Sequence, residues 1–85
     1  MIKKVIKVEV ESGLEARPIA MLVQVASQFE SKIYVESDSR KVNAKSIMGM
    51  MTLNLDSGSD IVVTAEGKDE EYALNEIEGY LSQVG

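Results

Sequence analysis

The sequence contains no cysteine and no histidine. Without cysteine there are no disulfide bonds, and without histidine there is no imidazole for acid–base catalysis or for the common zinc sites. These two absences remove much of the chemistry that enzymes use.

The chain also lacks a long apolar run and a surplus of basic residues. No segment approaches the length of a membrane span, and no signal-peptide core follows the N-terminus. We therefore expect a cytoplasmic protein without membrane contact. The net charge of −5 argues against direct binding of nucleic acid, because phosphate backbones attract basic surfaces.

The length of 85 residues, with 45% apolar and 27% charged residues, is typical of one small ordered domain, here residues 1–85. Apolar residues at every second position predict strands, and apolar residues three or four apart predict helices. The predicted strands are Val5–Glu11, Lys32–Glu36, Arg40–Asn43 and Ile61–Glu66. The predicted helices run from Ala16 to about Phe29, over a short segment capped by Ser46, and from Lys68 or Asp69 onward with Ala73, Leu74, Ile77, Leu81 and Val84 facing the core.

This β-α-β-β-α-β-α order predicts an α+β protein. Because the strands are short and have one apolar face, helices should cover one face of the sheet and leave the other to solvent. The result is an open-faced two-layer sandwich. The element order resembles a split β-α-β arrangement, for which a ferredoxin-like variant is the nearest fold on pattern alone.

The segment from Ser12 to Pro18 places a glycine, Glu15, Arg17 and the only proline directly before a helical pattern. A helix N-terminus presents unpaired N–H groups and the positive end of the helix dipole. The segment therefore predicts either an anion site or a charged helix cap.

Two segments resemble a known family. Gly13–Pro18 (GLEARP) resembles the active-site loop of HPr, the small phosphocarrier of the bacterial sugar phosphotransferase system, and Lys41–Gly49 (KVNAKSIMG) resembles its regulatory segment. The similarity covers essentially the whole chain. It implies the HPr fold, in which a four-stranded antiparallel sheet carries three helices on one face.

Glu15 stands where HPr proteins carry the phosphoryl-accepting histidine. The sequence is thus more similar to the HPr-like catabolite-repression proteins known as Crh, which lack that histidine, although most of those carry glutamine at this position. A carboxylate would form an acyl phosphate instead of a phosphoramidate, so relay activity is not expected. Glu15 is then a surface carboxylate near a helix start, or a permanent charge in place of phosphohistidine, and Arg17 is expected to contact a partner.

Ser46, on pattern alone, is the N-cap of a short helix. The resemblance implies instead that HPr kinase/phosphorylase phosphorylates it. A phosphate at a helix N-terminus meets free N–H groups, so the fold should tolerate the modification.

The residues after Ser46 predict a surface for a partner. A short helical turn cannot bury all of its faces, and methionine suits adaptable contacts, so Ile47 and Met51 should be exposed, while the burial of Met48 stays open. We define the docking surface as these three residues together with two residues of the first helix. Its members are Ala20, Met21, Ile47, Met48 and Met51, with Arg17 and Lys45 at the rim.

The resemblance implies a regulator that is not an enzyme and holds no metal or cofactor. Phosphorylated on Ser46, it would act as corepressor of CcpA, a LacI-type repressor, in carbon catabolite repression. Two alternatives stay open: a phosphocarrier that uses Glu15, and a phosphorylation-independent module that regulates a metabolic enzyme. A homodimer formed by exchange of the first strand also stays open.

Overall fold

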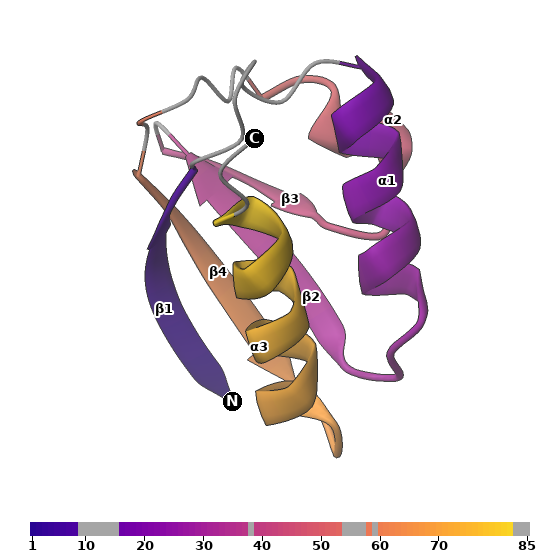
Figure 1. Ribbon diagram of the computed structural model, residues 1–85, viewed down its shortest axis with the longest axis vertical. Helices are drawn as coiled ribbons and strands as arrows, with labels where there is room; N and C mark the ends of the chain where they lie inside the picture. Colours follow the sequence, from indigo (N-terminus) through magenta and orange to yellow (C-terminus); the bar gives the residue numbers. More distant parts are fainter. Residues whose placement is uncertain (9–15, 38, 54–57, 59, 83–85) are drawn as a thin grey trace.

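A computed structural model of the chain describes residues 1–8, 16–37, 39–53, 58 and 60–82, and for residues 16–18 the backbone only. Within this part the elements follow the predicted order (Figure 1). They are β1 (Ile2–Lys7), α1 (Ala16–Ser27), β2 (Lys32–Ser37), β3 (Arg40–Asn43), α2 (Ile47–Met50), β4 (Asp60–Glu66) and α3 (Glu70–Leu81).

The strands form an antiparallel sheet in the order β1-β4-β2-β3. Because β4 pairs antiparallel with both β1 and β2, those two strands run parallel with β4 between them, as in the predicted split β-α-β arrangement. Helices α1 and α3 cover one face, and α2 packs against α1 and β3 (Figure 1). The predicted α+β, open-faced two-layer fold is confirmed.

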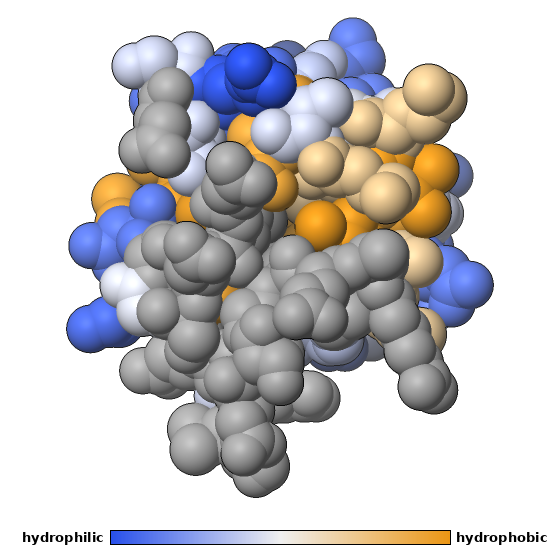
Figure 2. Space-filling model, turned by 90° about the horizontal axis from the view of Figure 1, so that it is seen from above, coloured by the Kyte–Doolittle hydropathy of each residue, from blue (hydrophilic) through white to orange (hydrophobic). Residues whose placement is uncertain are grey.

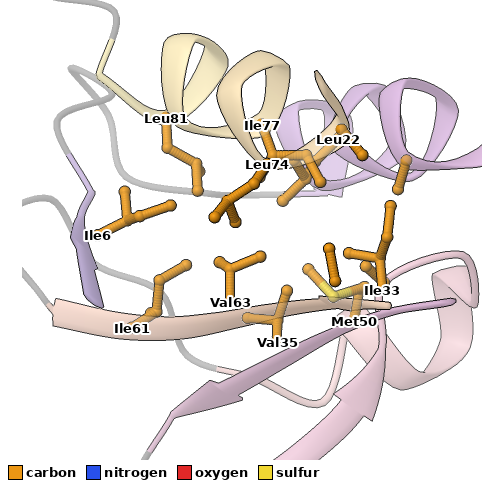
Figure 3. Packing of buried hydrophobic residues seen from close by; sticks show 14 of the residues in the cluster. Ile6, Leu22, Ile33, Val35, Met50, Ile61, Val63, Leu74, Ile77 and Leu81 are labelled. Atoms are coloured by element: carbon orange, nitrogen blue, oxygen red, sulfur yellow. The ribbon is translucent and has the colours of Figure 1, made fainter. Parts of the chain in front are cut away.

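The core lies between the sheet and the two long helices (Figure 3). Alternate residues of β2 and β4, such as Ile33 and Val63, point toward Leu22 of α1 and Ile77 of α3. The predicted inward positions of the last helix are buried, whereas Val84 lies outside the described residues. The buried apolar residues are Ile6, Val8, Ile19, Leu22, Ala26, Phe29, Ile33, Val35, Ala44, Met50, Leu53, Ile61, Val63, Ala65, Ala73, Leu74, Ile77 and Leu81.

The first strand differs from its prediction. It spans Ile2–Lys7 instead of Val5–Glu11, and residues 9–11 lie outside the described part of the chain. Lys4 hides the early start, because it interrupts the apolar alternation between Ile2 and Ile6. Its position at the sheet edge lets the ammonium reach Glu78 of α3, at 2.7 Å and 2.8 Å from the two carboxylate oxygens.

Helix α1 ends at Ser27, before the predicted end near Phe29. The backbone tightens there, because the N–H of Phe29 bonds to the carbonyl of Ala26, three residues back, at 3.3 Å. Phe29 is nevertheless buried, and its ring meets the ring of Tyr72 edge-on at 5.4 Å between centroids. Phe29 is therefore apolar because it packs in the core, and not because it belongs to the helix.

Helix α3 begins at Glu70, and Asp69 is its N-cap residue without a side-chain cap bond. The Asp69 carboxylate instead accepts hydrogen bonds from the backbone N–H groups of Glu30 and Ser31, both at 3.0 Å, and from the Ser31 hydroxyl. These bonds, the one from the Ser31 side chain first, hold the pKa of Asp69 below its ordinary value. Gly67 lies close beside Ser31, so this junction joins the turn before β2 to the start of α3.

Candidate functional site

Ser46 lies in the turn that joins β3 to α2. Asn43 shapes this turn, because its side-chain oxygen accepts from the N–H of Lys45 at 2.8 Å and its carbonyl accepts from the N–H of Ser46 at 3.0 Å. The backbone of Ser46 is extended, and its hydroxyl oxygen accepts from the N–H of Gly49 at 3.2 Å. Ser46 is therefore an N-cap as predicted, and its side chain is exposed.

The residues after Ser46 are divided sharply between core and solvent. Met50 has no exposed surface and anchors α2 in the core near Ile33 (Figure 3). Ile47 is 42% exposed, Met48 80% and Met51 54%. The structure thus settles the position of Met48, which the sequence left open, and agrees with the expected exposure of Ile47 and Met51.

The first helix adds to the same apolar region. Met21 of α1 is 48% exposed, Ala20 is half-buried, and α1 packs against α2. Apolar side chains, in orange and pale orange, gather on one side of the surface seen from above (Figure 2). Met21 and Met48 lie far apart in the sequence. They belong to the same region of the surface because α1 packs against α2.

The far end of α2 is held by polar contacts. The Thr52 hydroxyl donates to the carbonyl of Gly49 at 2.6 Å, and the Arg40 guanidinium donates to the carbonyl of Thr52 at 3.4 Å. Together with the cap at Ser46 and the buried Met50, these bonds hold α2 at both ends and on its inner face. The exposed side chains consequently project from a fixed backbone.

Lys45, which the sequence predicts at the rim of the docking surface, makes a contact within the protein. It is half-buried, and its ammonium donates to the carbonyl of Phe29 at 2.6 Å. The charge is therefore directed toward the turn after α1.

Glu15 lies outside the described residues, and only the backbone of Arg17 is described, in the first turn of α1. The predicted contact of Arg17 with a partner stays a prediction, and so do the two roles given for Glu15. Among the residues that the structure describes, no group of three or more acidic, histidine or cysteine side chains is arranged to hold a metal ion. The described helices include none that is long and apolar enough to cross a membrane.

The junction of Asp69 with residues 30 and 31 is the polar feature that sequence reasoning missed. The sequence predicted only that the last helix begins at Lys68 or Asp69, and it gave no role to Ser31. No local signal connects positions so far apart in the sequence, since their contact depends on how β2 and α3 are placed around the sheet.

Comparison with known proteins adds to this geometry. A family model described as "PTS HPr component phosphorylation site" matches residues 2–83. The HPr-like protein Crh of Halalkalibacterium halodurans is 45% identical over 83 residues, which cover 98% of this chain and 99% of that protein.

Two solved structures are similar over nearly the whole chain. The phosphocarrier protein HPr of Bacillus anthracis has a TM-score of 0.91 and 45% identity, covering 94% of this chain and 95% of that one. Crh of Bacillus subtilis has a TM-score of 0.75 and 42% identity, covering 95% and 93%, and is described as a dimer with a swapped domain.

Proposed function

The chain belongs to the HPr family, and from this membership we propose that it is a regulator of carbon catabolite repression that is switched by phosphorylation of Ser46. HPr kinase/phosphorylase adds the phosphate in the cytoplasm, and the phosphorylated protein is the corepressor of CcpA. The observation that carries the proposal is an exposed serine hydroxyl directly beside exposed apolar side chains on α2. The relatives are phosphocarrier and regulatory proteins, which confirms that the chain is not an enzyme.

Phosphorylation at Ser46 is compatible with the local fold. The Oγ atom attacks the γ-phosphorus of ATP, the bond to the bridging β,γ-oxygen breaks, ADP leaves, and the hydroxyl proton is released. The hydrogen bond that Gly49 now donates to Oγ can pass to a phosphate oxygen. The modification adds roughly −1.5 to −2 charges at neutral pH without entering the core, because the Ser46 side chain is exposed.

The docking surface provides the apolar part of the partner contact. Burying a methionine side chain fully contributes about 1.5–3 kcal/mol, and Met48 has most of its surface still available for burial. A basic residue of the partner then meets the phosphate in a charge-assisted hydrogen bond. Affinity depends on both parts, so the unmodified protein should bind weakly.

The phosphocarrier alternative is not favoured by the residues of this chain. The sequence has no histidine, and a carboxylate at Glu15 would give an acyl phosphate with different leaving-group chemistry. Incubation with Enzyme I and phosphoenolpyruvate, followed by intact-mass measurement, distinguishes the two. A hydroxylamine-sensitive adduct would establish the alternative.

The decisive experiment combines phosphorylation with binding. The full chain is treated with HPr kinase/phosphorylase and ATP, the modified residue is mapped by mass spectrometry, and binding to CcpA is measured before and after. Ser46→Ala should accept no phosphate and should not bind, whereas the matched control Ser82→Ala, at another exposed helix end, should behave like the wild type. Tight CcpA binding by Ser46→Ala would refute the proposal and would favour the phosphorylation-independent module.

Dimerisation is a separate prediction. Among the residues that the structure describes, β1 is an edge strand that pairs with β4 alone, along Ile2–Lys7, and it precedes the segment that contains Gly13. An exchanged β1 would pair with β4 of a second copy through the same interactions that it makes in the sheet here. Light scattering over a range of protein concentrations measures whether this chain is a monomer or a dimer.

A further inference from the structure

The thioether groups of this chain are distributed unevenly over its surface. Thioethers are its only sulfur groups, because there is no cysteine. Apart from the N-terminal Met1, the exposed methionines are Met21, Met48 and Met51, and all three belong to the docking surface. Met50, adjacent in sequence to Met51, is completely buried.

We propose that the methionines of the docking surface are an oxidation site, with Met48 the first to react, and that their oxidation to sulfoxides switches partner binding off. The inference rests on the proposed function, since it adds a second modification to the same surface. Phosphorylation of Ser46 adds the charge that a partner recognises, whereas oxidation removes the apolar contact beside it.

The oxidant is a peroxide such as hydrogen peroxide. The thioether lone pair attacks one peroxide oxygen, the O–O bond breaks and an S–O bond forms. The sulfur is oxidised by two electrons, and the peroxide is reduced to water. Cysteine thiolates are the usual competitors for peroxide in a protein, and here none is present. Methionine sulfoxide reductases reverse the change.

The exposed fractions predict the order of reaction. Met48 should react first, Met51 and Met21 should follow, and Met50 should not react while the protein is folded, because peroxide cannot reach its sulfur. Met48 and Met50 lie in the same turn of α2, so they differ in burial but hardly in position along the chain. Met50 is therefore an internal control for accessibility.

A sulfoxide changes binding without changing the fold. The reacting side chains lie outside the buried core, so their oxidation leaves the core packing intact. In a partner contact, however, the S–O dipole must lose its water, and a buried polar group without a hydrogen-bond partner opposes association. Oxidation of Met48 alone should lower the affinity for CcpA by about tenfold or more.

The test uses the full chain phosphorylated on Ser46. The protein is exposed to hydrogen peroxide for increasing times, each methionine is followed by peptide mass spectrometry, and CcpA binding and the melting temperature are measured on the same samples. The expected result is early oxidation at Met48, a parallel loss of binding, an unchanged melting temperature and recovery of binding after reductase treatment.

A variant with leucine at the exposed positions separates oxidation from other damage. Met21→Leu/Met48→Leu/Met51→Leu removes the oxidisable sulfurs of the docking surface, so its own affinity for CcpA, measured before peroxide, should be the same after peroxide. Met1 remains in this variant and reports that the oxidant acted. The matched control Met50→Leu should lose binding on oxidation like the wild type.

Three results would overturn the inference. These are oxidation of Met50 as fast as Met48, unchanged binding by oxidised wild type, and equal loss of binding by the triple-leucine variant. Failure of the proposed function looks different, because then the phosphorylated protein would not bind CcpA even before peroxide was added, and a switch on that binding would be excluded with it.

Discussion

Truncation of Met50 to alanine should destabilise the protein by about 2–5 kcal/mol, whereas truncation of Met48 should change stability by less than about 0.5 kcal/mol. The two residues share α2, but Met50 has no exposed surface and Met48 is the more exposed of the two by far. Removing the Met50 side chain takes away the only buried residue of α2 and leaves a cavity beside Ile33 (Figure 3). Removing the Met48 side chain takes away contacts with water.

The size of the effect makes it easy to measure. For a domain of this length, 1 kcal/mol shifts the melting temperature by roughly 4–8 °C, so a loss of about 3 kcal/mol corresponds to roughly 12–24 °C. Small domains have total stabilities of about 5–15 kcal/mol, so Met50→Ala removes a large share of the whole. The volume-conserving control Met50→Leu should cost less than about 1.5 kcal/mol.

Thermal and urea unfolding followed by circular dichroism measure these differences. Binding of phosphorylated protein to CcpA should show the opposite pattern, with a marked loss for Met48→Ala at unchanged stability. Comparable losses of melting temperature in the two alanine variants would show that α2 does not pack as described. Such a result would also remove the basis for treating Met48 as part of a free surface.

Two further changes test the junction between Ser31 and α3, and a third, in the middle of α3, is their control. The lowered pKa of Asp69 means that its hydrogen bonds stabilise the fold above the ordinary pKa of 3.8, and that this stability is lost as pH falls from there through the lower folded-state pKa. Asp69→Asn should therefore be less stable than the wild type at neutral pH and should lose less stability on acidification. Urea unfolding from pH 7 to pH 2 measures both proteins. Parallel curves of unfolding free energy against pH would contradict this explanation. Gly67→Ala should cost about 2 kcal/mol, because φ at Gly67 is 156° and a Cβ would lie 2.7 Å from the Cα of Ser31. Gly79→Ala, in α3 with nothing near its Cβ position, should instead stabilise by up to about 1 kcal/mol, and equal melting temperatures for the two alanine variants would argue against both explanations.

Much of the architecture could be predicted from residue periodicity. The segments Lys32–Glu36, Arg40–Asn43 and Ile61–Glu66 are strands within one residue of their predicted ends, because alternation is a local property. The start of β1 was missed where Lys4 occupies a core-facing register position. A charged residue suits that position because the Lys4 side chain stays exposed on the edge strand and pairs with Glu78 of α3.

The candidate site was predicted in part for the same reason. Ser46 could be identified because a cap bond to Gly49 spans only three residues, and because the surrounding motif resembles a family segment. The sequence could not decide the burial of Met48, since Met48 and Met50 are chemically identical and both lie within one short turn. Which of them faces the core depends on where α2 sits against α1 and β3.

The sequence by itself determined the order of elements, the capped turn at Ser46 and the absence of histidine and cysteine chemistry, because each depends on composition or on neighbours a few residues apart. The tertiary structure alone decided that Met48 is exposed while Met50 is buried, that the Lys45 ammonium bonds to the carbonyl of Phe29, and that the Asp69 carboxylate bonds to Ser31. These features rest on contacts between segments distant in sequence, whose geometry exists only once the helices have packed on the sheet.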